Sequence, residues 1–150
     1  MTTETPPNDP NKTLVAFQPL EKINTHAATP ATISYDNIKL AIKLPYYRFH
    51  EMQGFKVPKG DMKIALIGGG PSVAGQIDAI KNFDGVTVAC GSSYDWCVNN
   101  GITPNYCVVC DPDPISANYI TKPQFSTIFL VATQCDPKVF DTLKLNAIFM

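Results

Sequence analysis

A repeated order of short apolar runs and helical stretches, from residue 62 onward, restricts the chain to one class of fold. Strand-length apolar runs lie at 63–67, 86–90, 106–110, 127–132 and 147–150. Helical stretches cover 73–83, 94–99 and 137–143, and turn residues separate them from the apolar runs. Strands and helices that alternate at these lengths predict a parallel sheet covered on both faces. We therefore predict an α/β, Rossmann-like domain of about five strands with helices on both faces.

The regular pattern does not extend to the beginning of the chain. We predict a disordered tail, an irregular N-terminal arm with one short helix, and the Rossmann-like domain, at residues 1–12, 13–60 and 61–150. The helix in the arm is expected to begin with Ser34 or Asp36 as its cap and to end at Leu44, before a proline. The domain stops at Met150 inside its last apolar run, which is expected either of a truncated domain or of a C-terminal edge strand.

Composition and charge exclude several classes of function. With 45% apolar and 17% charged residues, 150 residues can bury one ordinary core. A formal net charge of -1 predicts no basic field for nucleic acid or for an anionic membrane. No apolar run approaches the roughly 20 residues of a membrane-spanning helix. The chain has five cysteines, an odd number, and its N-terminus contains no apolar signal segment. Both features predict a reducing, cytoplasmic location.

The glycine-rich turn after the first apolar run is the strongest candidate for a ligand site. Glycines lack a Cβ, so their N–H groups can approach a phosphate and their φ can be positive. Ser72 could cap the next helix or bind the ligand, and that helix would add its positive dipole end. We predict that this turn binds nucleotide phosphates through Gly68, Gly69, Gly70, Pro71 and Ser72.

The spacing of this turn departs from the standard nucleotide-binding motifs. It lacks the lysine of the P-loop, and Val73 stands where the dinucleotide fingerprint has its third glycine. A tight strand-to-helix turn that binds nothing remains the alternative.

Polar residues that follow the next two strands are expected at the same edge of the sheet. Asp111 and Asp113 follow the run at 106–110 and could hold Mg²⁺ against substrate phosphates, although Asp-Pro pairs also simply form turns. Ser92 and Ser93 follow the run at 86–90 and could bind a ribose or base, although capping of the next helix is the favoured role.

Other chemically interesting residues have simpler explanations. Cys107 and Cys110 are three apart on a predicted strand and point to opposite faces, which argues against a zinc site or a redox pair. Trp96 is more typical of helix-sheet packing than of a base-stacking platform.

Three segments together resemble a known family. They are IALIGGGPS at 64–72, ACGSS at 89–93 and GITPNYCVVCDP at 101–112. In this order and spacing they resemble the MptE-like family, which includes archaeal 6-hydroxymethyl-dihydropterin diphosphokinases and the motility accessory factors of flagellin glycosylation. The resemblance implies a Rossmann-like fold that binds ATP with Mg²⁺, or a CMP-activated sugar. It also implies that Gly68, Gly70, Pro71 and Ser72 contact phosphates and that Asp111 faces the metal or ligand.

Three functional hypotheses follow. The first is Mg²⁺-dependent diphosphate transfer from ATP to a hydroxymethylpterin-like acceptor, with Asp111 and Asp113 as catalytic and metal-binding residues. The second is a glycosyltransferase-like domain that uses a CMP-sugar. The third is a non-catalytic binding or assembly module, in which the N-terminal arm holds a protein partner or a second copy. Arg48 is the only arginine, so little positive charge is available to neutralise a transferred diphosphate.

Overall fold

A computed structural model describes residues 29–48, 61–144, 146 and 148–150 of the chain. The predicted tail at 1–12 and most of the predicted arm, at 13–28 and 49–60, lie outside the described residues.

The described part is built on one parallel sheet whose strands lie in sequence order. The strands are β1 (Ile64–Ile67), β2 (Val86–Cys90), β3 (Tyr106–Val109), β4 (Ile128–Val131) and β5 (Ile148–Phe149). In this register Ala89 lies opposite Cys107, and Cys107 opposite Phe129. The predicted α/β fold with a parallel sheet of about five strands is confirmed, and the fifth strand has only two residues.

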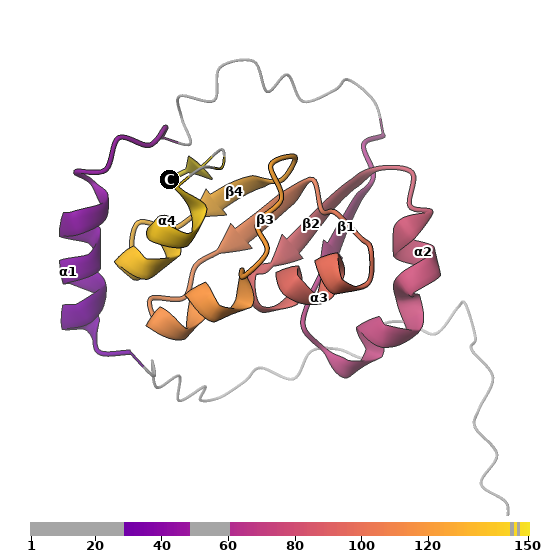
Figure 1. The fold of residues 1–150 in the computed structure, drawn as a ribbon, viewed down its shortest axis with the longest axis horizontal. Coiled ribbons are helices and arrows are strands. Elements are labelled where there is room, and N and C mark those ends of the chain that lie inside the picture. The colour runs from indigo at the N-terminus through magenta and orange to yellow at the C-terminus, as the bar shows by residue number, and fades with distance from the viewer. Residues whose placement is uncertain (1–28, 49–60, 145, 147) are drawn as a thin grey trace, which may run out of the picture.

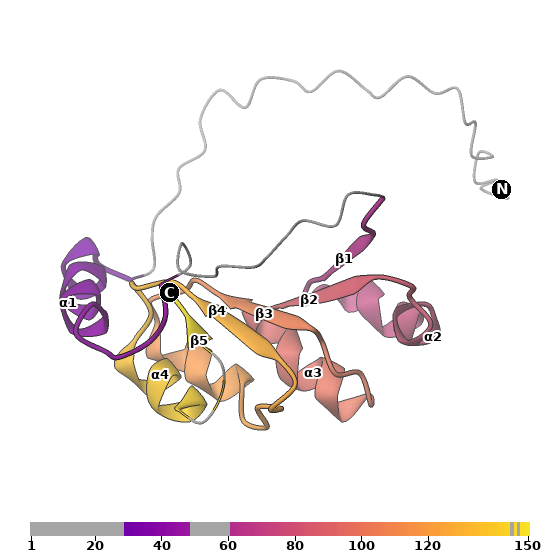
Figure 2. The ribbon, with the colours of Figure 1, turned by 90° about the horizontal axis from the view of Figure 1, so that it is seen from above.

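Helical segments connect the strands. The α-helices are α1 (Ala31–Ala41), α2 (Ile77–Lys81), α3 (Tyr94–Asn99) and α4 (Pro137–Leu143). The 3-10 helices are η2 (Pro71–Gln76), η3 (Gly91–Ser93) and η4 (Pro114–Tyr119). Figure 1 shows the order of these elements, and Figure 2 shows α2, α3 and α4 on one face of the sheet, with α1 beside α4.

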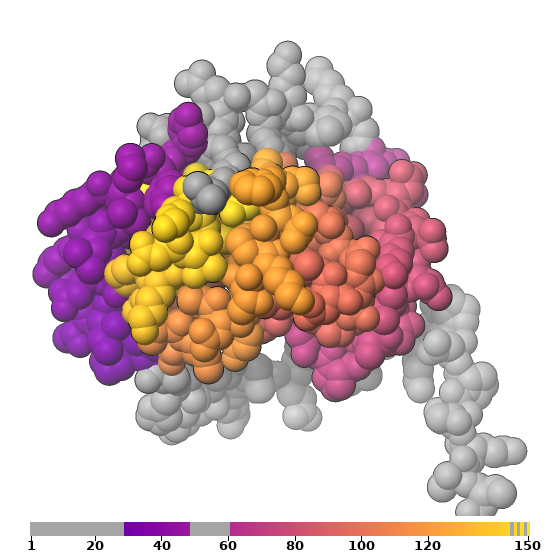
Figure 3. All heavy atoms as spheres, in the orientation of Figure 1, coloured from indigo at the N-terminus to yellow at the C-terminus, as the bar shows by residue number. Residues whose placement is uncertain are grey.

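The strand order explains why the described crossover helices share a face, whereas we expected helices on both faces. A right-handed crossover between neighbouring parallel strands always passes over the same side of the sheet. Since each strand here pairs with the next in sequence, every crossover returns on that side. In Figure 3 the helical side forms the viewer's surface, and the indigo α1 lies against the yellow α4.

The core lies between the sheet and these helices. Alternate strand residues are buried on this side, as Cys107, Val109, Phe129 and Val131 illustrate. The ring of Tyr94, on α3, lies 5.2 Å from that of Phe129 between centroids.

The opposite side of the sheet is here called the open face. Its residues are apolar but only partly covered: Ile64, Leu66, Val86, Val88, Tyr106, Val108, Ile128 and Leu130. Ile64 is 55% exposed and Leu66 is 75% exposed. Parallel sheets are normally buried on both faces, so this surface is unusual for the fold.

The bounds of α3 and α4 agree with the sequence prediction. Asp136 caps α4 by accepting a 2.9 Å hydrogen bond from the backbone N–H of Lys138, and Gly101 ends the α3 region with a φ of 72°. The predicted caps of α1 are wrong, because α1 begins at Ala31 after Pro30. None of the described helices is long and apolar enough to cross a membrane.

Candidate functional site

The glycine turn lies at the carboxyl end of β1 and is exposed. Its glycines do not use positive φ, which among the described residues occurs only at Gly101. A Cβ added to Gly68 would have no neighbour within 4 Å, and one added to Gly70 would meet only Ser72 Oγ, at 3.9 Å. The fold therefore has room for side chains at these two positions, and glycine leaves open space beside the backbone.

The segment after the turn differs from the predicted helix over 73–83. It begins as η2 and becomes α-helical only in the five residues of α2. Gly75 lies inside η2, and a glycine disfavours a regular helix interior. Of the two roles considered for Ser72, capping is excluded, because Ser72 lies inside η2 and the N-cap positions of η2 and α2 are Gly70 and Gln76. The helix dipole thus contributes less at this turn than the sequence suggested.

The serine pair joins the glycine turn to β2. Ser93 is buried, and its hydroxyl hydrogen-bonds the carbonyl oxygens of Ile67, at 2.5 Å, and Cys90, at 2.8 Å. Ser93 occupies the N-cap position of α3 but makes no side-chain capping bond, so the favoured prediction of a capping hydroxyl is wrong. Ser92 is exposed, and its Oγ would lie 3.0 Å from a Cβ on Gly69. The turn and the serine pair therefore lie side by side.

The two candidate carboxylates both shape their own loop. Asp113 N–H donates a 2.9 Å hydrogen bond to Asp111 Oδ1, and Asp113 Oδ1 accepts one of 2.9 Å from the N–H of Ile115. The second bond caps η4. Both carboxylates serve as turn formers through one oxygen each. Their strand, β3, lies two positions from β1, a spacing of about 10 Å at the usual strand separation.

A buried amide from outside the predicted domain holds this loop. Asn37, on α1, is only 6% exposed and donates to the carbonyl oxygens of Gln134, at 3.0 Å, and Pro112, at 3.4 Å. Gln134 in turn donates from Nε2 to the carbonyl oxygen of Cys110, at 2.6 Å. Sequence reasoning missed Asn37, because contacts across 75 and 97 residues leave no local pattern.

The cysteines divide between buried and exposed positions. Cys107 is buried and Cys110 exposed, as expected for opposite directions from the strand region. Burial raises the pKa of Cys107 strongly, that of Cys135 to about 12 and that of Cys97 to about 11. Within the described ranges, no group of three or more His, Cys, Asp or Glu residues could hold a metal ion.

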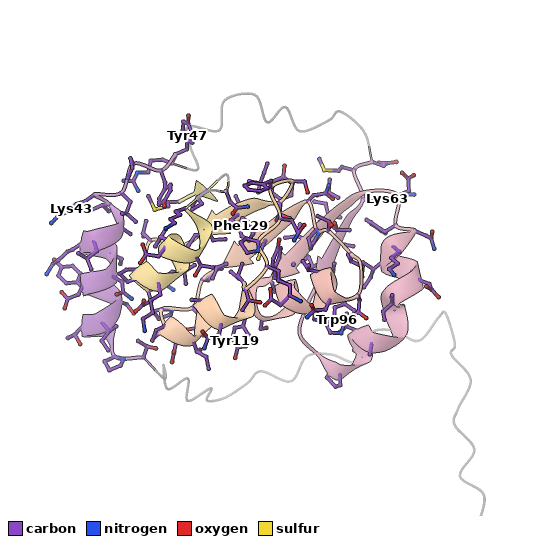
Figure 4. The ribbon with its side chains drawn as sticks, viewed as in Figure 1. Lys43, Tyr47, Lys63, Trp96, Tyr119 and Phe129 are labelled. Atoms are coloured by element: carbon purple, nitrogen blue, oxygen red, sulfur yellow. The ribbon has the colours of Figure 1, made fainter. Side chains whose placement is uncertain are left out.

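Two cavities flank the glycine turn. One of about 490 Å³ lies between β1 and the η2–α2 segment, and Leu66, Ser72 and Phe83 are in its lining. The other, of about 290 Å³, lies between Gly69–Pro71 and the residues Ser92, Ser93 and Trp96. Figure 4 shows Trp96 on α3, next to η2. Trp96 is half-buried and packs against the core, as predicted, and it also lines this second cavity.

Comparison with known proteins extends the resemblance beyond the three motifs. The sequence matches the family model described as "MptE-like: 6-hydroxymethylpterin diphosphokinase MptE-like" over residues 34–150, which includes most of α1 and the whole sheet. No curated protein and no solved structure matches the chain. Since the match covers well over half of the sequence, the chain belongs to the MptE-like family.

Proposed function

We propose that this chain binds a nucleoside triphosphate at the carboxyl edge of its sheet and transfers a diphosphate to a hydroxymethylpterin-like acceptor. The single observation that carries this proposal is the exposed backbone of the glycine turn, open at Gly68 and Gly70, next to the serine pair and at the same sheet edge as Asp111 and Asp113. Membership of the MptE-like family supports the same reaction class.

The turn would bind phosphates through its backbone. Open space beside Gly68 and Gly70 lets a phosphate oxygen approach the N–H groups closely. The only arginine, Arg48, donates to the carbonyl oxygen of Ile42 at 2.8 Å, next to α1. Backbone donors are therefore the main groups proposed to hold the phosphates on this side of the sheet.

The carboxylate loop fits a magnesium ion that is shared with the substrate. Mg²⁺ is usually held by one or two carboxylates together with phosphate oxygens and water. Asp111 and Asp113 supply two carboxylates from one loop, and the known contacts of that loop use only Oδ1 of each. When bound, Mg²⁺ would neutralise charge on the phosphates.

In the proposed reaction, the acceptor hydroxyl oxygen forms a bond to the β-phosphorus of ATP, and the bond from that phosphorus to the α,β-bridging oxygen breaks, releasing AMP. The hydroxyl proton must leave as the new bond forms. We assign its acceptance to Asp111 or Asp113, the carboxylates at this edge. Most of the catalysis would come from positioning the two substrates.

The experiment is calorimetric titration with ATP and with CMP, each with and without Mg²⁺. Gly70→Val should abolish binding by filling the space next to the turn, whereas Gly75→Val, in η2, is the matched control. Asp111→Asn keeps the acceptor for the Asp113 N–H but removes the charge, so it should remove the Mg²⁺ dependence. Asp84→Asn, at an exposed position before β2, is the control for charge.

The outcomes separate the candidate functions. Mg²⁺-dependent ATP binding that both site variants lose, followed by AMP release with a 6-hydroxymethylpterin acceptor, supports the proposal. Metal-independent CMP binding would replace it with the CMP-sugar transferase. Absence of binding to either nucleotide would leave the non-catalytic module.

A second candidate function, assembly, is favoured by the open face. An apolar surface with Leu66 at 75% exposure is typical of a surface that packs against another molecule. A second copy of the chain is the partner that we propose. The predicted role of the N-terminal arm in such contacts concerns residues outside the described ranges.

We also propose the cytoplasm as the compartment of the protein, because all five cysteines are free thiols.

A further inference from the structure

The cavity between η2 and α3 has a lining without charge. The glycine turn forms one wall, Val73 and Ala74 belong to η2, and Ser92, Ser93 and Trp96 form the opposite side. No side chain in the lining carries a charge at neutral pH. Such a lining suits a neutral, flat ring better than a phosphate.

The size of the cavity suits one part of a ligand rather than a whole ligand. Ligand clefts usually enclose about 300–1,000 Å³. A volume of about 290 Å³ lies at the lower limit, which suits one ring system. The phosphates of the same ligand would then lie outside the cavity, on the exposed glycine turn.

The wall that carries Trp96 is fixed on both sides. Ser93 ties the start of α3 to the ends of β1 and β2 through its two hydrogen bonds. On the other side, the Asp95 carboxylate accepts hydrogen bonds of 2.9 and 2.6 Å from the N–H and hydroxyl of Thr121. A fixed helix presents its indole in a constant position, which reduces the entropy cost of stacking a ligand ring.

The position of the cavity distinguishes it from the larger one beside it. The 490 Å³ cavity lies between β1 and the η2–α2 segment, and no residue of β2 or β3 is in its lining. The cavity at Trp96 lies on the β2 side of the same turn, toward the loop of Asp111. A ligand that reaches from the turn toward Asp111 therefore passes the second cavity.

We propose that Trp96 forms one wall of a subsite that stacks on the planar heterocyclic ring of the ligand, while the glycine turn holds its phosphates. This inference rests on the proposed function, because it adds a ring subsite to the proposed phosphate site. The base of the nucleotide and the ring of the acceptor share the required chemistry, and the experiment separates them.

The test uses the fact that Trp96 is the only tryptophan, so its fluorescence reports on one position. Wild-type protein is titrated with adenosine, with 6-hydroxymethylpterin, with ATP and Mg²⁺, and with inorganic tripolyphosphate. We expect quenching by the ligand whose ring enters the cavity and none by tripolyphosphate. Quenching by adenosine assigns the subsite to the base, and quenching by the pterin assigns it to the acceptor.

Variants then connect the signal to binding, measured by calorimetry. Trp96→Leu should weaken the ring-containing ligand about tenfold, the scale of one lost stacking contact, and Trp96→Phe should restore most of the affinity. Tripolyphosphate binding should not change in either variant. Phe125→Leu removes an aromatic ring that is 80% exposed, outside the cavity lining, and is the matched control.

The failure of this inference differs from that of the proposed function. Equal ring-ligand affinity in wild type and Trp96→Leu, without quenching, would overturn the ring subsite alone. Quenching by a nucleoside or pterin without any phosphate binding would support the subsite and overturn the phosphate site. If Trp96→Leu does not fold, quenching in the wild type decides the matter.

Discussion

The side-chain amide of Asn37 lies 3.0 Å from the carbonyl oxygen of Gln134, and this bond attaches α1 to the loops at the carboxyl edge of the sheet. The same amide reaches the carbonyl oxygen of Pro112, between the two candidate carboxylates. Asn37 itself is buried, so its amide needs these acceptors as partners.

We predict that Asn37→Ala lowers the free energy of unfolding by about 1–3 kcal/mol, because two partly buried carbonyl oxygens lose this donor. Urea denaturation measures this change. Asn82→Ala, which removes an exposed bond within one helical turn, is the control and should cost less. If the two variants lose the same stability, the amide of Asn37 has no special role. Weaker Mg²⁺-dependent ATP binding by folded Asn37→Ala would further connect α1 to the site.

Ser92 and Ser93 are neighbours in sequence but should differ in their effect on stability. Ser93→Ala leaves the carbonyl oxygens of Ile67 and Cys90 without this hydroxyl donor, so we expect a loss of about 1–3 kcal/mol in a thermal or urea unfolding experiment. Ser92→Ala changes an exposed side chain and should alter stability by less than about 0.5 kcal/mol. An equal loss in both variants would contradict this assignment.

The comparison of sequence with structure shows which features are local. The strands, the cap at Asp136 and the glycine end at Gly101 depend on short patterns, and the structure contains them as predicted. Asn37 could not be found in this way, because its partners lie 75 and 97 residues away. The local sequence predicted that Ser93 caps α3. Its hydroxyl instead donates to the carbonyl oxygen of Ile67 at the end of a neighbouring strand.

The side on which the helices lie also depends on information that periodicity does not carry. The apolar runs indicate buried strands, and the usual consequence is cover on both faces. Strand order decides where the crossovers go, and this order is set by contacts between β1 and β2, then β2 and β3, along the whole sheet. The exposure of Leu66 follows from that order and from its position on the edge strand.

The cysteines should divide into two classes of reactivity. Cys90 and Cys110 are exposed, whereas Cys97, Cys107 and Cys135 are buried. With an aromatic disulfide reagent at pH 8, we expect two thiols to react in the native protein and all five after denaturation. Mass spectrometry of the labelled peptides identifies them. Fast labelling of Cys107 in the native state would contradict the buried core described here.

Burial of thiols also predicts a loss of stability in alkali. The pKa of Cys97 rises from its ordinary value of 9.0 to about 11, and that of Cys135 to about 12. Above pH 9 the unfolded chain releases these protons while the native chain keeps them, so the free energy of unfolding falls as pH rises toward 12. Urea denaturation at pH 8, 9.5 and 10.5 measures the slope. Cys97→Ala should reduce the slope, whereas Ser92→Ala, which removes no thiol, is the control.

The open face gives the last prediction, which concerns association. An apolar sheet face that the described residues cover only in part leaves apolar surface in water, and the largest exposure on the open face is that of Leu66, at 75%, on the edge strand β1. We expect the chain to associate with itself through this face, and Leu66→Lys to shift it toward the monomer by placing a charge in the contact. Sedimentation velocity over a range of protein concentrations measures the shift. Leu40→Lys is the control, because Leu40 is 51% exposed on α1 and outside the open face. A wild-type chain that stays monomeric at all concentrations, or an equal shift in both variants, would remove the second copy as the partner of this surface.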